Sequence, residues 1–223
     1  MKTKFALLLI VSGILFSSCK KDDDEIINEP IFENGKLKLE NFAASLPPNA
    51  RAIVDHPSDS PDAYFNVDLS NASLLDGKWP GWCVETGISI TPGNRNAARV
   101  YSSYDENLSD YDGVFMNRLN WIINQKFVEQ GFTYGEIQIA VWTLKHGYVT
   151  FNDDVAAELH NTRPPDLFDP KSIGEWNKEK VNEILTLAAG ISDFMPDYGG
   201  VIAVLLVHDD NQDLVIEYRL QAE

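Results

Sequence analysis

The chain has 223 residues, of which 44% are apolar, 11% aromatic and 23% charged. This balance is typical of one globular domain, and it excludes a disordered or collagen-like chain. The chain carries 18 Lys and Arg residues against 34 Asp and Glu residues, a formal net charge of −16. Because such a surface repels phosphate backbones, nucleic acid is not expected as a partner.

The N-terminal segment has the zones of a secretory signal. Two lysines precede an apolar run over residues 5–16, which is too short to span a membrane. The small residues directly before Cys19 resemble a bacterial lipobox, in which the cysteine is lipidated and becomes the first mature residue. The lysine-acid stretch 20–25 resembles the segment that follows this cysteine in many surface-displayed lipoproteins of Bacteroidetes-type bacteria. An uncleaved anchor helix or a simple signal is the alternative.

These zones divide the chain into three parts. We expect a lipoprotein signal peptide over residues 1–18, a flexible acidic tether over 19–35 and a single domain over 36–223. The tether is expected because its polar residues show no periodic apolar pattern. The protein would then be exported as an outer membrane lipoprotein exposed at the cell surface, and only the Cys19 lipid would touch the membrane.

The first half of the domain has the patterns of strands. Residues 63–69 alternate polar and apolar side chains, which predicts a strand with one solvated face. Segments 81–90 and 97–104 predict two further strands, separated by a turn cluster at 91–94. Cys83 is therefore expected early in a strand.

The second half changes to a helical period. Apolar residues at helical spacing predict one helix over 113–130. A capping box at Thr133–Glu136 predicts a second helix that ends near Gly147. Two more helices are expected, the first after residues 152–154 and the second from a capping box at 172–175.

The C-terminal segments 201–207 and 214–220 predict a β-hairpin. Its first strand is apolar throughout and is therefore expected at the centre of a sheet. Together, the elements predict an α+β fold, with an antiparallel β core covered by a central run of packed α-helices.

The chain contains two cysteines. If Cys19 carries lipid, Cys83 has no partner for an intramolecular disulfide. A lone thiol in an exported protein is a buried core residue, an intermolecular bridge, a nucleophile or part of another covalent link.

Two short motifs carry the most specific signal. The first is Trp82-Cys83-Val84-Glu85, on a predicted strand, and the second is the segment 137–142, Ile-Gln-Ile-Ala-Val-Trp, on the capped helix. They resemble the two signatures of the thioester domains of bacterial surface adhesins, an aromatic-Cys-apolar step and an apolar-Gln-x-x-apolar-Trp step. Residues 116–124 also resemble the helix that precedes the glutamine helix in that family. The resemblance covers residues 64–146.

The resemblance implies an internal thioester between Cys83 and Gln138. The Cys83 thiolate would attack the side-chain amide of Gln138 and expel ammonia, and a lysine amine of a partner would later displace the sulfur. The domain would act once, as an adhesin that covalently captures a host or neighbouring surface protein. It would therefore not be an enzyme, and the resemblance implies no cofactor.

Four neighbouring side chains are candidates for supporting roles. The aromatic residues Trp82, Tyr134 and Trp142 would keep water from the bond. Glu85 lies two residues beyond Cys83 on the same strand face and would accept a proton, although a solvated surface carboxylate is the simpler interpretation. The N-terminus of the glutamine helix would steady an oxyanion on Gln138.

Two other functions stay open. The first is a non-covalent glycan- or protein-binding surface lipoprotein, in which Cys83 is structural. The second is a cysteine hydrolase, which needs a histidine next to Cys83. The four histidines lack the spacing of zinc ligands, and no metal site is expected. The acidic run 209–213 mimics the start of a calcium loop, but Leu214 occupies the glycine position, and a hairpin turn explains the run.

Overall fold

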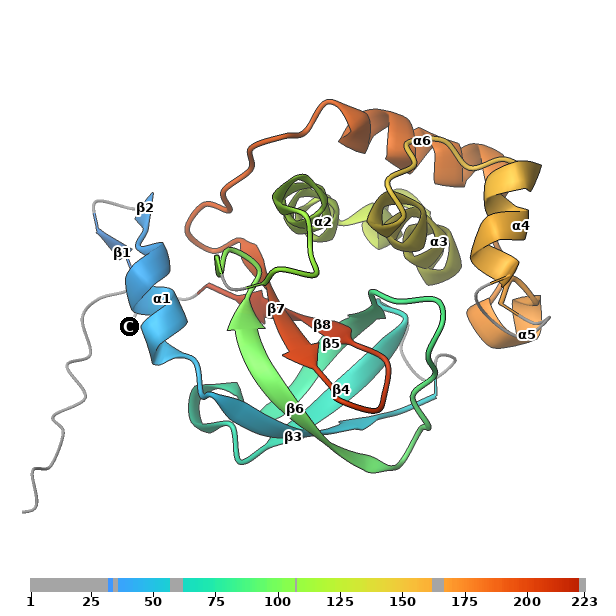
Figure 1. The fold of residues 1–223 in the computed structure, drawn as a ribbon. Coiled ribbons are helices and arrows are strands. Elements are labelled where there is room, and N and C mark those ends of the chain that lie inside the picture. Colours follow the sequence, from blue (N-terminus) through green and yellow to red (C-terminus); the bar gives the residue numbers. More distant parts are fainter. Residues whose placement is uncertain (1–31, 34–35, 57–61, 107, 162–166, 221–223) are drawn as a thin grey trace, which may run out of the picture.

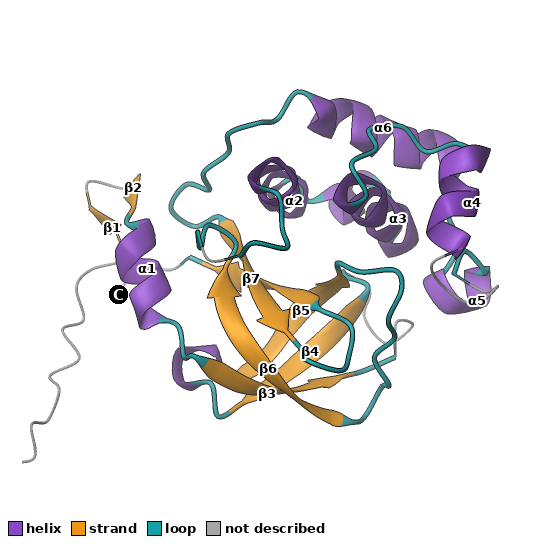
Figure 2. Cartoon of the chain, viewed as in Figure 1, coloured by secondary structure: helices purple, strands orange, loops and turns teal. Residues whose placement is uncertain are grey.

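A computed structural model describes residues 32–33, 36–56, 62–106, 108–161 and 167–220. The predicted signal peptide, most of the predicted tether and Cys19 lie outside these residues. The described chain forms a closed antiparallel β-barrel with a layer of helices above it (Figures 1 and 2). This architecture confirms the expected α+β class.

The barrel has six strands in the order β3-β4-β5-β8-β7-β6, and every neighbouring pair is antiparallel. The two C-terminal strands close the barrel between β5 and β6, so the central helices are an excursion between β6 and β7. The strands are β3 (Asn49–Val54), β4 (Phe65–Ser70), β5 (Gly77–Cys83), β6 (Arg95–Ser102), β7 (Val201–Val207) and β8 (Leu214–Arg219).

Side chains fill the barrel interior closely. A Cβ atom added at Gly81 of β5 would lie 2.7 Å from Val67 and 2.9 Å from Phe65, both on β4. Real side chains do not approach so closely, so this position needs glycine for β5 to pack on β4. The strand that carries Cys83 is thereby fixed against its neighbour.

The helical layer is built around α3 (Tyr134–Lys145), which packs on β5 and on α2, α4, α5 and α6. Its first turn has the predicted capping box, in which Thr133 and Glu136 satisfy each other's backbone N–H groups. Every residue from 135 to 144 is buried. The other helical segments are α1 (Leu39–Ser45), α2 (Gly113–Asn124), α4 (Asp153–Asn161), α5 (Pro170–Ile173), α6 (Lys178–Ala189), and the short 3-10 turns η2 (Ser73–Leu75) and η3 (Phe127–Gln130).

Two predicted helix boundaries are wrong. The helix expected over 113–130 ends at Asn124, because Lys126 adopts a left-handed conformation (φ 54°) and the chain resumes only as a 3-10 turn. The capping box expected at 172–175 does not open a helix. Instead α6 begins at Lys178, and the side chain of Asn177 caps it by accepting from the N–H of Lys180.

The strand expected over 81–90 is also displaced. It runs over Gly77–Cys83, so Cys83 is its last residue rather than an early one. The strand β3 and the helix α1 were not predicted. At the end of the predicted tether, β1 (Phe32–Glu33) pairs with β2 (Lys36–Leu37).

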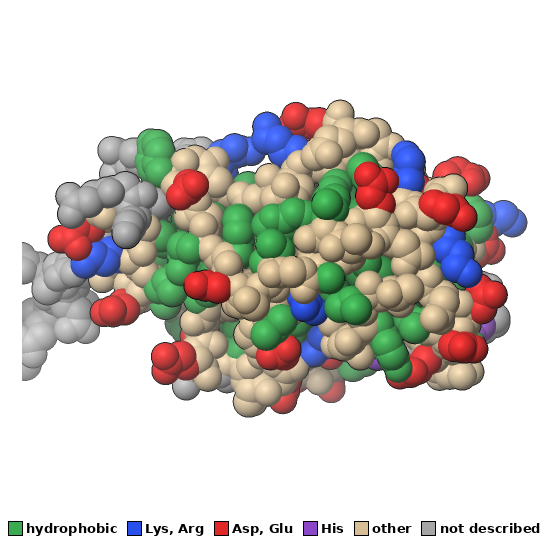
Figure 3. Space-filling view, turned by 90° about the horizontal axis from the view of Figure 1, so that it is seen from above, with side chains coloured by type: hydrophobic (Ala, Val, Ile, Leu, Met, Phe, Trp, Pro, Cys, Tyr) green, Lys and Arg blue, Asp and Glu red, His purple; other side chains and the backbone are tan. Residues whose placement is uncertain are grey.

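The surface of the helical side is mixed. Hydrophobic side chains are exposed over the middle of this face, and most Asp and Glu side chains are spread around its margin without forming one patch (Figure 3). No helix in the described ranges is long and apolar enough to cross a bilayer.

Candidate functional site

The two sequence motifs meet at Cys83. The side-chain amide of Gln138, on α3, pairs with the backbone of Cys83, at the end of β5. The N–H of Cys83 donates to Gln138 Oε1 at 2.9 Å, and Gln138 Nε2 donates to the carbonyl oxygen of Cys83 at 2.7 Å. Cys83 is 1% exposed and Gln138 is not exposed at all. The Gln138 amide is therefore held in one orientation in a site closed to water.

This pairing follows from the end of the barrel ladder. The N–H of Val84 donates to the carbonyl of Asp213, directly before β8, so the polar backbone groups of Cys83 point to the other side of the strand. On that side the pairing with β4 stops at Phe65 and Gly81. Because buried backbone groups need partners, the Gln138 amide takes the place of a further β4 residue. The two hydrogen bonds place Gln138 Cδ opposite the Cα of Cys83. The Cys83 sulfur is only two covalent bonds from that Cα.

A second glutamine holds the sulfur. Cys83 Sγ donates to Gln212 Oε1 at 2.9 Å, and Gln212 Nε2 donates to the backbone carbonyl of Glu85. Gln212 lies in the connection between β7 and β8 and is 1% exposed. Sequence reasoning missed this residue, because only the pairing of β5 with β8 brings it next to Cys83.

Glu85 takes part in a half-buried acidic network. Its carboxylate is partly exposed and accepts from the backbone N–H of Asp213 at 3.1 Å. Burial raises the pKa of Glu85, and the hydrogen bond from Asp213 opposes that rise. The Asp213 carboxylate in turn accepts from the Tyr111 hydroxyl at 2.6 Å and from the backbone N–H of His208 at 2.8 Å. The acidic run at 209–213 lies in the connection between β7 and β8, which is the expected hairpin turn.

A lysine lies beside this network. Lys145 Nζ is 3.9 Å from the centre of the Tyr111 ring and donates to the carbonyl of Asp110 at 2.8 Å. Burial lowers the pKa of Lys145, while Glu85, Asp110 and Asp213 act in the opposite direction. The Lys145 ammonium group thus lies close to the acidic residues near the end of β5.

Two of the three predicted aromatic residues lie on the glutamine face of α3. Tyr134, Gln138 and Trp142 are spaced by four residues and therefore share one face. The ring of Tyr64, at the start of β4, lies 6.3 Å from that of Tyr134 and 6.0 Å from that of Trp142. Trp142 is fully buried, and its Nε1 has no hydrogen-bond partner among the described residues. These three rings form an apolar cluster on the side of α3 that carries Gln138.

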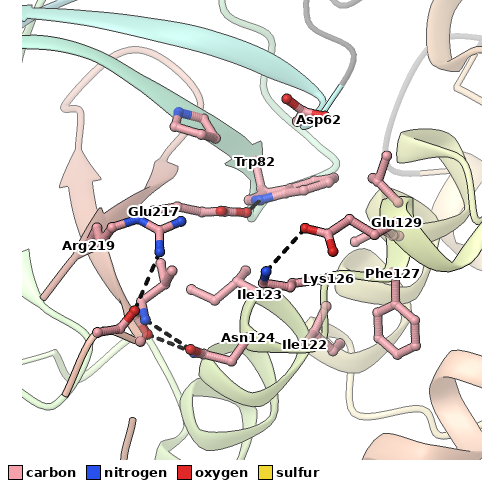
Figure 4. A pocket seen from close by; sticks show the side chains of 16 residues that line it. Asp62, Trp82, Ile122, Ile123, Asn124, Lys126, Phe127, Glu129, Glu217 and Arg219 are labelled. Carbon is pink, nitrogen blue, oxygen red and sulfur yellow. Dashed lines mark hydrogen bonds and ion pairs between the residues drawn. The ribbon is translucent and has the colours of Figure 1, made fainter. Parts of the chain in front are cut away.

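Trp82 points elsewhere. Neighbouring residues of a strand face opposite sides, so Trp82 faces away from the Cys83 side chain. Its Nε1 donates to Glu217 Oε1 at 2.7 Å, in a pocket of about 390 Å³ between the barrel, α2 and η3 (Figure 4). Burial raises the pKa of Glu217 to about 7, against the opposing effect of the Trp82 hydrogen bond. The structure therefore does not bring Trp82 to the sulfur.

The histidines lie in separate places. No group of three or more His, Cys, Asp or Glu side chains that would suit a metal ion occurs within the described part of the chain. His146 Nε2 lies 3.0 Å from Thr86 Oγ1. The His208 ring is buried, and this burial lowers its pKa.

Comparison with known proteins gives matches to solved structures only. No protein-family model and no curated protein matches this chain. The N-terminal thioester domain of a surface protein from Clostridium perfringens aligns with a TM-score of 0.44 at 12% identity, over 77% of this chain and 99% of that domain. The N-terminal domain of the Streptococcus pyogenes pilus tip adhesin Cpa aligns with a TM-score of 0.45 at 12% identity, over 78% of this chain and 94% of that domain.

Proposed function

We propose that Cys83 and Gln138 form an internal thioester, and that the protein is a surface adhesin that uses this bond to capture a lysine amine of a partner protein. The observation that carries the proposal is the reciprocal hydrogen bonding between the Gln138 amide and the Cys83 backbone. It joins, in one buried place, the two motifs that resemble the thioester signatures.

The two hydrogen bonds suit the bond-forming step. The Cys83 N–H polarises the Gln138 carbonyl and is placed to stabilise the oxyanion that forms when Cys83 Sγ attacks Cδ. This donor comes from the strand end, in place of the helix N-terminus that the sequence indicates. The Sγ–Cδ bond forms, the Cδ–Nε2 bond breaks, and the thiol proton leaves with the nitrogen as ammonia. The carbonyl of Cys83 holds that leaving nitrogen beforehand.

Capture reverses the role of the sulfur. A lysine amine of the partner attacks the thioester carbonyl, an amide to Gln138 Cδ forms, and the Cys83 thiol is released. Each chain acts once, so the protein is not an enzyme that turns over. The burial of both residues protects the bond from water, and the target amine reaches it only after local opening. The net charge of −16 favours a basic partner surface.

The place of action is part of the proposal. We propose an exported lipoprotein of the outer membrane, anchored by lipid on Cys19 and displayed on the cell surface. Cys19 and residues 1–18 lie outside the described residues. The proposed partner is a host or neighbouring surface protein with an accessible lysine.

The mass of the purified domain tests the proposal. With the bond formed, the domain weighs one ammonia less than its sequence, its Cys83 resists iodoacetamide, and methylamine adds to Gln138 while it releases the thiol. Cys83→Ala and Gln138→Ala should each restore the full mass, whereas Gln130→Ala, on the exposed turn η3, should not. A wild-type domain of full mass with an alkylatable Cys83 would refute the thioester.

A non-covalent binding lipoprotein is the second candidate. It is favoured by the fact that the Gln138 amide satisfies the strand end without any covalent bond. The pocket beneath Trp82 would then be the place to seek a ligand. The full sequence mass, together with partner binding that survives Cys83→Ala, would support this candidate over the thioester.

A further inference from the structure

We infer that Gln212 is a positioning residue that aims the Cys83 sulfur during thioester formation. The inference rests on the proposed function and adds a third residue to its site. Gln212 lies 129 positions from Cys83 and belongs to neither sequence motif. Its Oε1 nevertheless accepts the hydrogen bond of the Cys83 thiol at 2.9 Å.

The contacts of Gln138 and Gln212 give the two side chains different roles. Gln138 presents a carbonyl polarised by a backbone N–H, which is the state of an electrophile ready for attack. Gln212 presents its carbonyl oxygen to the thiol, and a donor approaches such an oxygen near the amide plane. Attack on a carbonyl carbon instead requires the sulfur above that plane. The hydrogen bond to Gln212 Oε1 therefore assigns Gln212 the part of thiol acceptor, and the motif residue Gln138 the part of acyl donor.

Gln212 can aim the sulfur because its own side chain is fixed. Its Nε2 donates to the carbonyl of Glu85, which lies two residues after Cys83. On either side, the Val84 N–H donates to the Asp213 carbonyl at 3.2 Å, and the Asp213 N–H donates to the Glu85 carboxylate at 3.1 Å. These bonds hold the β7–β8 connection against the end of β5. An amide fixed in this way leaves the thiol few alternative rotamers.

The hydrogen bond also distinguishes the states of the site. Within the described ranges, the donor to Gln212 Oε1 is the Cys83 thiol, and this hydrogen bond lasts only while the thiol proton is present. In the thioester the sulfur carries no proton, so a buried acceptor loses its donor, which is unfavourable. Aminolysis restores the thiol and therefore the hydrogen bond. Gln212 thus orients the free thiol before the thioester forms, and it favours release of the thiol when an amine attacks.

Refolding from urea measures the effect on formation. Chains purified unfolded from inclusion bodies are diluted into buffer, and the fraction that has lost ammonia is followed by mass spectrometry. Gln212→Met keeps the length of the side chain and removes both the acceptor for the thiol and the Nε2 donor that fixes it to Glu85, and it should slow the loss of ammonia roughly tenfold. Gln130→Ala is the matched control and should react at the wild-type rate. A wild-type rate in folded Gln212→Met would overturn the inference and leave the thioester in place.

The thiol itself gives a second readout that needs no thioester. In a Gln138→Ala background, an acceptor on the neutral thiol raises the pKa of Cys83, so adding Gln212→Met should lower the pH midpoint of its alkylation. An unchanged midpoint would overturn the inference. So would loss of ammonia in Gln138→Ala with a mapped Cys83–Gln212 link, because Gln212 would then be the acyl donor. Loss of ammonia in no variant, with the midpoint lowered, would refute the thioester and retain Gln212 as the residue that positions the thiol.

Discussion

At the scale of single residues, Gln138 has two roles that are separable in principle. As a packed side chain, it satisfies the last unpaired backbone groups of β5 at Cys83. As a chemical group, it offers the carbonyl carbon of the proposed thioester. The sequence indicated only the second role. Gln138 has no exposed surface, so its truncation also removes a deeply packed side chain.

We therefore predict that Gln138→Ala is strongly destabilising. It leaves a buried N–H and a buried carbonyl without partners and opens a cavity, so the free energy of unfolding should fall by roughly 2–5 kcal/mol. Urea denaturation measures the change, and exposed Gln130→Ala is the control. A loss below about 1 kcal/mol would mean that water or another group takes over the pairing.

At the scale of elements, α3 is the part that sets the site. Its capping box fixes where the helix begins, and Gln138 follows in the second turn. The buried Glu136 extends this cap to the next layer, because its second carboxylate oxygen accepts from the N–H of Asn177 at 3.1 Å, directly before α6. The start of α3 and the start of α6 are thereby tied to one side chain.

We predict unequal costs for the two halves of this cap. Thr133→Ala removes a half-buried hydroxyl that accepts from the N–H of Glu136 and donates to the carbonyl of Glu175, and it should lower the free energy of unfolding by about 1 kcal/mol. Glu136→Ala leaves the N–H groups of Thr133 and Asn177 without their acceptor, and it should cost more, roughly 2–4 kcal/mol. Chemical denaturation of the two variants checks the order. Equal costs would contradict a role for Glu136 in joining α3 to α6.

At the scale of the whole molecule, the closure of the barrel by β7 and β8 creates both the proposed site and the pocket at Trp82. On one face of β5 it brings Gln212 to Cys83, and on the other it brings Glu217 to Trp82. Glu217, on β8, is the titratable group whose pKa reflects its burial in the closed barrel. Its pKa is raised from an ordinary value of 4.5 to about 7, because burial disfavours its charge.

This shift predicts a pH dependence of stability. The folded state binds the Glu217 proton more tightly than the unfolded state, so the stabilisation is complete below about pH 4.5 and is lost as the pH rises through about 7. Glu217→Gln keeps an oxygen for the Trp82 indole and removes the charge. It should leave stability at pH 5 nearly unchanged and raise it at pH 8 by roughly 1–3 kcal/mol. Thermal denaturation at both pH values measures this, and an equal effect at both would contradict a partly buried charge at Glu217.

The sequence by itself determined the features that depend on near neighbours. The capping box and apolar residues of α3, the hairpin of β7 and β8, and the α+β class all follow from periods and caps within a few residues. The strand β3 was missed because two of its three buried side chains are alanines, which give a weak apolar signal. The motifs also indicated Cys83 and Gln138, through a resemblance rather than through geometry.

Only the tertiary structure decided which side chains meet at Cys83. The contact of Gln212 with the sulfur spans 129 positions and depends on the pairing of β5 with β8. Trp82 was assigned to the sulfur from its place in the chain, but the alternation of a strand turns it to the opposite face. Local periodicity tells which face of an element is buried, but it does not tell which distant element covers that face. That choice is made by the register of the closed barrel.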